Sequence, residues 1–177
     1  MALTTGRLVL RQWRASDRGP FADMNASPVV MEHFPALMSR AASDAFVDRM
    51  SAHIDSDGWG LWALEVAETG EFIGFTGLSV PSFEAHFMPA VEVGWRLAPR
   101  AWGKGYATEA ARRALAYGFE TLGLREVVSF TATTNTRSQS VMRRIGMTHD
   151  PVDDFDHPAI DASSPLQRHV LYRARAA

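Results

Sequence analysis

The chain has 177 residues, a length that suits one domain with a full hydrophobic core better than two. Its hydrophobic fraction of 46%, charged fraction of 21% and net charge of -2 argue against a disordered chain and against a nucleic-acid partner held by a basic surface. The absence of cysteine excludes disulfides, cysteine zinc sites and cysteine nucleophiles. Because no apolar run has the length of a signal peptide or a membrane span, we expect a cytoplasmic protein with no membrane partner.

The amino-terminal part of the sequence predicts a strand followed by two helices. Residues 8–13 are rich in β-forming residues and end near Ser16 and Asp17, which favour a helix start. A second helix is expected from about Ser39 through Met50. The residues expected on its buried face are Ala42, Ala45, Phe46 and Met50.

The next segments predict an antiparallel meander of strands. Glycines precede the apolar runs 61–66 and 72–78, and residues 68–71 supply a turn between them, so these runs predict a hairpin. Residues 81–89 form a loop rich in Phe and His, after which the alternation of a strand resumes over residues 91–97.

A glycine-punctuated turn then separates that strand from a strongly helical segment. Gly103 and Gly105 flank Lys104, so consecutive backbone N–H groups can turn toward one anion beside the positive end of the following helix. A dinucleotide fingerprint would need a third glycine where Thr108 stands, and a Walker loop would need Ser or Thr directly after Lys104. A structural turn without ligand is the alternative reading.

The carboxy-terminal part predicts alternating helices and strands. Residues 106–122 form the best helix in the chain, with a face of small residues, and Gly123 ends it. A strand over residues 127–133 makes a βαβ unit parallel to residues 91–97, and a short helix follows over residues 138–144. The acidic stretch 150–158 lacks the spacing of a calcium site, so no metal is expected, and residues 169–173 predict the last strand.

The run from Arg100 to Gly105 has the form Arg-x-x-Gly-x-Gly and is followed by an alanine-rich helix. It resembles the pyrophosphate-binding motif of the GNAT superfamily of acetyl-CoA-dependent N-acetyltransferases, and the flanking segments 91–97, 127–132 and 135–138 stand in the order of that family. The likeness covers essentially the whole chain and is greatest to the RimJ/RimL type of ribosomal-protein N-terminal acetyltransferases.

The resemblance implies an α/β (α+β) fold with one N-acetyltransferase domain over residues 1–177. Its sheet is expected to be mixed, mostly antiparallel, with about six or seven strands, a central splay and helices on both faces. The implied activity is an acyltransferase that moves the acetyl group of acetyl-CoA to a primary amine, either a protein N-terminus or a small molecule. A homodimer is left open.

The same resemblance assigns residues to the cosubstrate acetyl-CoA. Loop amides would hold its pyrophosphate, the strand 95–97 would pair with its pantetheine arm, and Asn135 would contact that arm. The residues expected to bind it are Trp95, Arg96, Leu97, Arg100, Gly103, Lys104, Gly105, Tyr106, Ala107, Thr108, Asn135 and Ser138. As an alternative to ligand binding, Asn135 and Ser138 are good helix caps.

Two residues are candidates for proton transfer. Glu92 stands where several members of the superfamily carry a glutamate base, and an acid inside an apolar strand is expected to have a raised pKa; an edge-facing or salt-bridged glutamate is the alternative. Many relatives place a tyrosine a few residues after the position of Ser138 to protonate the thiolate. None stands there in this chain, so Ser138 or a water takes the role.

Two other functions remain open at this stage, a noncatalytic acyl-CoA-binding or sensing module and a nucleotide-binding protein. For the acceptor, loops 29–37 and 81–89 are expected to set specificity. His33 in the first loop is a candidate lining residue, although a histidine beside Phe and Pro more often has a packing role. The aromatic residues that could line that side, or equally belong to the core, are Phe34, Trp59, Phe83 and Phe87.

Overall fold

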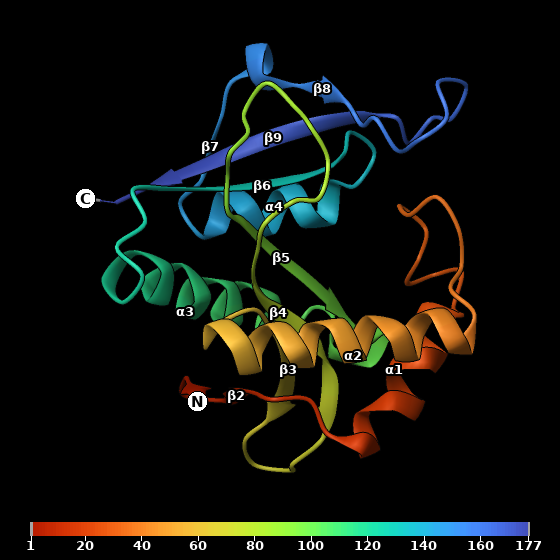
Figure 1. Cartoon of the computed structure of the whole chain (residues 1–177), viewed down its shortest axis with the longest axis vertical. Coiled ribbons are helices and arrows are strands. Elements are labelled where there is room, and N and C mark those ends of the chain that lie inside the picture. The colour runs from red at the N-terminus through yellow and green to blue at the C-terminus, as the bar shows by residue number, and fades with distance from the viewer. Residues whose placement is uncertain (1, 177) are drawn as a thin grey trace.

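The strands pair into one nine-stranded sheet in the computed structural model, which describes residues 2–176 (Figure 1). Their order is β1-β2-β3-β4-β5-β6-β9-β7, and β8 also pairs with β9. The strands are β1 (Leu3–Thr4), β2 (Leu8–Arg11), β3 (Leu61–Val66), β4 (Phe72–Ser79), β5 (Glu92–Leu97), β6 (Glu126–Ala132), β7 (Thr148–His149), β8 (Phe155–Asp156) and β9 (Arg168–Arg175). The α-helices are α1 (Arg18–Asn25), α2 (Arg40–Asp57), α3 (Tyr106–Glu120) and α4 (Thr136–Arg144).

The predicted fold class is confirmed, with one correction to the number of strands. The hairpin β3–β4, the antiparallel meander β3-β4-β5 and the parallel pair β5–β6 all form as predicted, and β2 extends this meander by pairing with β3. The sheet has nine strands where six or seven were expected. The extra ones, β1, β7 and β8, have two residues each, too few for a period-two pattern to be visible in the sequence.

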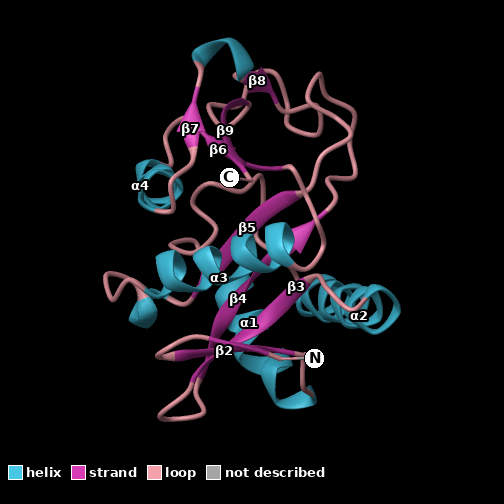
Figure 2. Cartoon of the chain, turned by 90° about the vertical axis from the view of Figure 1, so that its left-hand side faces the viewer, coloured by secondary structure: helices cyan, strands magenta, loops and turns pink. Residues whose placement is uncertain are grey.

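Helices cover both faces of the sheet, as Figure 2 shows with α2 and α4 on opposite sides of the strands. On one face Phe75 of β4 packs against Phe21 of α1 and Phe46 of α2. On the other face Gly118 of α3 lies against Leu78 of β4, so that an added Cβ would stand 3.1 Å from that leucine. The glycine therefore lets α3 lie close to the sheet.

Helix α2 is longer than the sequence suggested, and its buried stripe differs. It continues from Arg40 to Asp57 and ends at Gly58, whose φ of 78° is the left-handed conformation of a C-terminal cap. Its buried residues are Ser43, Val47 and Ile54, whereas the predicted Ala42 and Ala45 are exposed. Ser43 is buried because its hydroxyl accepts a hydrogen bond from the amide of Asn25 at 2.9 Å.

The sheet opens at its centre, between β5 and β6. These strands share the single register pair Glu92↔Val128, next to which the N–H of Val128 donates to the carbonyl of Val91 at 2.9 Å. Beyond that point they diverge, while β6 stays fully paired with β9 (Figure 1). The predicted splay is therefore present, and it leaves one edge of β5 without a neighbouring strand.

No helix among residues 2–176 is long and apolar enough to cross a membrane.

Gly74 of β4 is a position where the packing of β5 excludes any side chain. Its φ is 134°, and an added Cβ would stand 2.1 Å from the carbonyl oxygen of Arg96. We predict that Gly74→Ala lowers the free energy of unfolding by about 2–4 kcal/mol, measured by urea denaturation. Gly6→Ala, where nothing lies within 4 Å of the added Cβ and φ is not in the left-handed region, is the control and should change stability by less than about 1 kcal/mol. Equal stabilities of the two variants would contradict this account.

Candidate active site

A cavity of about 1650 Å³ occupies the opening between β5 and β6. Its lining comes from β5, β6, the loop before α3, the starts of α3 and α4, and the loop 29–35. The predicted site residues that line it are Glu92, Trp95, Arg96, Leu97, Gly103, Gly105, Tyr106, Ala107, Thr108, Asn135 and Ser138. The splay thus brings together residues from both sides of the βαβ crossover.

The open edge of β5 presents backbone groups of alternate residues. Because the carbonyl of Val91 faces β6, those of Trp95 and Leu97 face the same side. The Leu97 carbonyl already accepts from the indole N–H of Trp102 at 2.8 Å, so the open groups are the N–H and C=O of Trp95 and the N–H of Leu97. The predicted backbone pairing of Arg96 with the pantetheine arm is wrong, because the carbonyl of Arg96 faces β4 at Gly74. It contributes its side chain instead.

The loop before α3 uses glycine where the backbone requires it. Gly103 has a φ of 74° and Gly105, the residue before α3, a φ of 80°, both in the left-handed region. The N–H of Glu109 is the first to bond within the helix, to the carbonyl of Gly105 at 3.0 Å. The N–H groups of residues 106–108 are therefore free of helical partners at the positive end of α3.

Two predicted residues of this loop do not line the cavity. The Arg100 guanidinium pairs with Glu71 at 2.5 Å and donates to the carbonyl of Phe72 at 2.8 Å, which ties the loop to β4. The backbone carbonyl of Lys104 accepts a hydrogen bond from the guanidinium of Arg7 at 3.0 Å. Both residues hold the loop from outside.

An amino-terminal segment supports the same loop. Glu109, in the first turn of α3, accepts hydrogen bonds from the hydroxyl of Thr5 at 2.6 Å and from the N–H and Nε of Arg7 at 3.0 and 2.7 Å. These bonds lower the pKa of Glu109 despite its partial desolvation. Glu109 is thus an ionised anchor for the start of the chain, and Arg7 stacks over Tyr106 at 4.9 Å.

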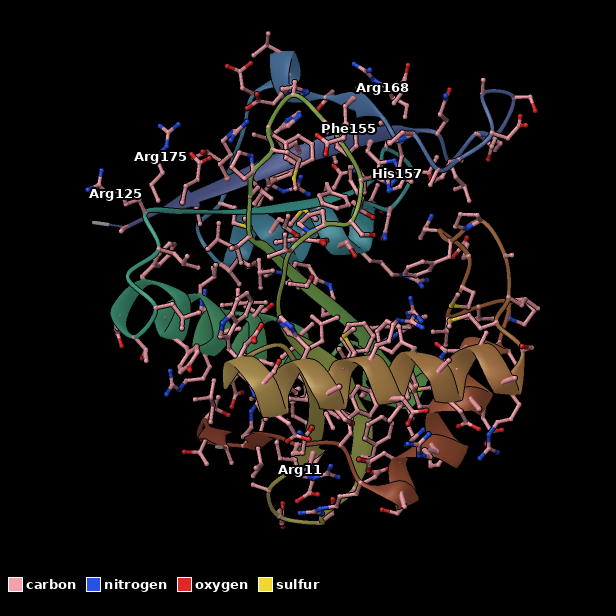
Figure 3. All side chains as sticks on the ribbon, viewed as in Figure 1. Arg11, Arg125, Phe155, His157, Arg168 and Arg175 are labelled. Carbon is pink, nitrogen blue, oxygen red and sulfur yellow. The ribbon has the colours of Figure 1, made fainter. Side chains whose placement is uncertain are left out.

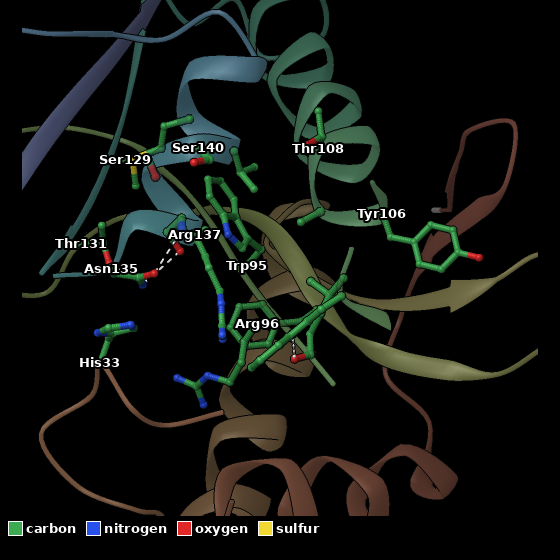
Figure 4. A pocket seen from close by; sticks show the side chains of 18 of the residues that line it. His33, Trp95, Arg96, Tyr106, Thr108, Ser129, Thr131, Asn135, Arg137 and Ser140 are labelled. Atoms are coloured by element: carbon green, nitrogen blue, oxygen red, sulfur yellow. Dashed lines mark hydrogen bonds between the residues drawn. The ribbon is translucent and has the colours of Figure 1, made fainter. Parts of the chain in front are cut away.

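The start of α4 lies across the opening from β5. Asn135 caps this helix by accepting from the N–H of Ser138 at 3.1 Å, and its amide donates to the hydroxyls of Thr131 and Ser138 at 2.9 and 3.1 Å (Figure 4). Asn135 is therefore a helix cap, whereas Ser138 is not. Because the Ser138 oxygen accepts from Asn135, its own proton is left to donate into the cavity.

The two faces of the sheet give the cavity two chemically different sides. On β5, Glu92, Gly94 and Arg96 share the face of α1 and α2, and the register places Val128 of β6 there too. Trp95 extends to the face of α3 and α4 (Figure 4). We call the α1/α2 side, with Glu92 and Arg96, the acceptor face, and the α3/α4 side, with the glycine loop, the donor face.

Glu92 carries the most perturbed carboxyl group of the site. Its side chain lines the cavity and makes no hydrogen bond or ion pair with residues 2–176. Burial raises its pKa to about 8, because no cation stands nearby to stabilise the charged form. The salt-bridged alternative is excluded for these residues, and a carboxyl group with a pKa near neutral pH suits proton transfer.

The remaining walls of the acceptor face come from loop 29–35 and the β6–β9 end. His33 contacts the hydroxyl of Thr134 at 3.3 Å and so connects this loop to the far side of the opening. His157 and His169, 5.0 Å apart between ring centroids, also line the cavity, and desolvation lowers the pKa of both.

The predicted aromatic lining is only partly present. Phe34 lines the cavity, but Trp59 packs on His53. Phe83 and Phe87 belong to a second small core with Phe155 of β8, near His157 (Figure 3). No residue of loop 81–89 lines the cavity, so its expected role in acceptor specificity is not supported. Within this loop Phe87 is buried, and it packs against Phe155 of β8, a strand that was invisible in the sequence.

Sequence reasoning missed the arginines of the donor face. They are Arg7, Arg112, Arg113, Arg137 and Arg144. Arg137 stacks over the ring of Trp102 at 4.8 Å, which joins the start of α4 to the glycine loop. One signal was available, since Arg112 follows Thr108 by four residues and therefore shares its helix face. The others depend on tertiary contacts.

Comparison with known proteins agrees with this geometry. The acetyltransferase (GNAT) domain family matches residues 7–148. An FsC-acetyl coenzyme A-N(2)-transacetylase of Aspergillus fumigatus is 44% identical over 96 residues, which are 52% of this chain and 40% of that protein's length. An acetyltransferase structure from Agrobacterium tumefaciens has 30% identity and a TM-score of 0.79, covering 99% of this chain and 95% of its own.

A ribosomal-protein α-N-acetyltransferase of the RimL type, solved with coenzyme A, has a TM-score of 0.77 at 14% identity and covers 99% of this chain and 98% of its own. That likeness concerns the fold alone. The chain belongs to the GNAT acetyltransferase family, and the predicted enzyme class, an acyltransferase, is confirmed at the level of the family.

The raised pKa of Glu92 makes stability depend on pH in a defined direction. Between about pH 4.5 and 8 the folded chain keeps the proton that the unfolded chain releases, so rising pH costs stability through this group. We predict that the stability of Glu92→Gln relative to the native chain rises from pH 5 to pH 8 and then levels off, measured by urea denaturation. Glu84→Gln, at an exposed position, is the matched control for the loss of a carboxyl group. A flat difference for Glu92→Gln would show that its carboxyl is solvated.

Proposed function

We propose that this protein transfers the acetyl group of acetyl-CoA to a primary amine by direct attack within a ternary complex, as one N-acetyltransferase domain over residues 1–177. The observation that carries the proposal is the cavity through the splay. It joins an anion-binding helix start on the donor face to a carboxyl group of raised pKa on the acceptor face. Family membership and the relative whose name contains acetyl coenzyme A support the same donor.

The donor face fits a phosphate-bearing thioester. The free N–H groups of residues 106–108 suit a pyrophosphate, with Gly103 and Gly105 leaving room for its close approach. Arginines such as Arg137 add positive charge for further phosphate oxygens. The C=O of Trp95 and the N–H of Leu97 offer the pairing of an added strand to the amides of the pantetheine arm.

The chemistry then takes place where the two faces meet. Glu92, ionised above its pKa, accepts a proton from the ammonium group, and the free amine attacks the thioester carbonyl carbon. The N–H of Trp95 is the donor that would stabilise the oxyanion, a contribution typically worth about 3 kcal/mol. The C–S bond breaks, and the thiolate receives a proton from Ser138 or a water. The attacking nitrogen loses its second proton at this stage, and that proton restores the group that protonated the thiolate.

Several features remain predictions of the sequence, namely a cytoplasmic location, the absence of nucleic-acid partners, and the RimJ/RimL type of acceptor. The last calls for a screen of peptides with free N-termini, polyamines and amino acids. Release of CoA thiol is a clean readout, because the chain itself has no cysteine. Acetyl-CoA binding without thiol release from any amine would favour a noncatalytic acyl-CoA-binding module.

The donor site is tested by filling the glycine loop. We predict that Gly103→Ala combined with Gly105→Ala weakens acetyl-CoA binding at least tenfold in calorimetric titration, because Cβ atoms and backbone strain displace the amides. The matched control is Gly70→Ala with Gly123→Ala, which have φ values of 70° and 67° and equally open surroundings away from the cavity. Equal affinity of both double variants would refute the assignment.

The acid–base role is tested by Glu92→Gln. We expect kcat to fall by about 10²–10³-fold with acetyl-CoA affinity nearly unchanged, as is typical for loss of a general base. In the native protein kcat should rise with pH around pH 8 as Glu92 ionises, and Glu92→Gln should show no such rise. Glu84→Gln on the exposed loop serves as control. A Glu92→Gln variant that keeps both kcat and the pH profile removes this residue from the mechanism.

A further inference from the structure

Arg96 is a partly buried cation of the acceptor face that no carboxylate balances. Its Nη1 donates to the side-chain carbonyl of Asn25 at 2.6 Å and contacts the sulfur of Met38 at 3.7 Å. The guanidinium also lies over the rings of Phe34 and Phe75, at 4.2 and 5.5 Å. No Asp or Glu among residues 2–176 forms an ion pair with it.

The unused part of this guanidinium is the edge formed by Nε and Nη2. Nε is buried without any hydrogen-bond partner, and Nη2 makes none with the described residues. That edge offers two parallel N–H groups, the arrangement that binds a carboxylate with two hydrogen bonds. Glu32, the nearby acid of loop 29–35, is largely exposed and stands 3.8 Å from His33 instead.

Leaving a guanidinium in such a place is costly unless a ligand compensates it. Buried charges in proteins are normally paired, and a neutral amide replaces only part of the lost hydration. Desolvation lowers the pKa of Arg96 to about 10, so the group still carries its charge at neutral pH. A positive charge therefore stands permanently in the wall of the acceptor side.

The position of Arg96 relates it to the amine-activating end of the site. Arg96 and Glu92 lie four residues apart on the same face of β5, about 13 Å between Cα atoms in an extended strand. Between them Gly94 leaves the strand surface bare, since an added Cβ would meet only Oε1 of Glu92, at 3.7 Å. Figure 4 shows Arg96 extending into the cavity below Trp95, on the side of the loop that carries His33.

We propose that the acceptor is an amine that also carries a carboxylate, which binds the Nε/Nη2 edge of Arg96 while the molecule crosses Gly94 toward Glu92. This inference rests on the proposed acetyl transfer and names its substrate class. The carboxylate belongs either to a free amino acid or to an acidic residue of a peptide near its free N-terminus. Simple polyamines, which carry only positive charge, are poor acceptors.

The test compares acceptors that differ only in this charge. Each free amino acid is paired with its carboxamide, and each peptide with glutamate after its N-terminal residue is paired with the glutamine version. Thiol release should show kcat/KM at least tenfold higher for the carboxylate in one of these two series, which identifies its source. Amidation lowers the pKa of a neighbouring amine, so amine basicity works against the predicted preference.

Variants then assign the preference to Arg96. Arg96→Gln should reduce the ratio of kcat/KM between the carboxylate acceptor and its amide to about one, mainly through KM. Its acetyl-CoA affinity should be unchanged. Arg96→Lys should restore part of the ratio. Arg49→Gln on the outer surface of α2 is the control. Gly94→Ala, which the surroundings tolerate, should raise KM for the carboxylate acceptor and leave acetyl-CoA binding unaltered.

A binding measurement separates this inference from the proposed function. N-acetylated forms of the same acceptors are titrated calorimetrically into the CoA-loaded protein and into its Arg96→Lys and Gly94→Ala variants. Binding that needs the carboxylate and weakens in these variants supports the inference even if no amine releases thiol. Thiol release that is equal for acids and amides and unaffected by the Arg96 variants overturns it, while leaving acetyl transfer established.

Discussion

The single contact between β5 and β6 is the constraint on which the site depends. A strand inside a sheet must satisfy its backbone groups on both edges, and β5 meets β6 only at Glu92 and Val128. The other backbone N–H and C=O groups on this edge of β5 must therefore find hydrogen-bond partners outside β6. The indole of Trp102 takes one carbonyl, and the groups of Trp95 are left for a ligand. Helices α3 and α4 then flank the gap, and the stacking of Arg137 on Trp102 joins the start of α4 to the loop before α3.

The pleat of β5 sorts chemistry between the two sides of this gap. Alternate side chains point to opposite faces, so Glu92 and Arg96 stand with α1 and α2 while Trp95 stands with α3 and α4. The positively charged donor face and the carboxyl group of Glu92 therefore lie on opposite faces of the same strand. The donor side is rich in arginine, and the acceptor side combines the carboxyl of Glu92 and the guanidinium of Arg96 with two histidines of lowered pKa. Two reactants can approach from opposite faces and meet only in the gap.

The parts of the site that the sequence predicted are those governed by local rules. Glycines at positive φ, an asparagine cap and the apolar alternation of β4 and β5 leave signatures within a few residues of each other. What it did not predict depends on distant partners. Whether the backbone of Arg96 faces β4 or the gap follows from its register against Gly74, and the burial of Phe83 follows from the two-residue strand β8. The end of α2 was missed although Gly58 marks it, because the apolar face of the helix weakens beyond Met50.

The anchoring of the first residues on Glu109 couples the start of the chain to the donor loop. Thr5 and Arg7 bind the carboxylate of Glu109, and Arg7 also holds the carbonyl of Lys104 inside the loop. An anion bound at the start of α3 would order the glycine loop that Thr5 and Arg7 contact. Because such coupling is reciprocal, a ligand there tightens the amino-terminal segment to the extent that the segment tightens the ligand. The backbone amide of Arg7 donates to Glu109, so its protection from hydrogen exchange would report occupancy of the donor site at a distance.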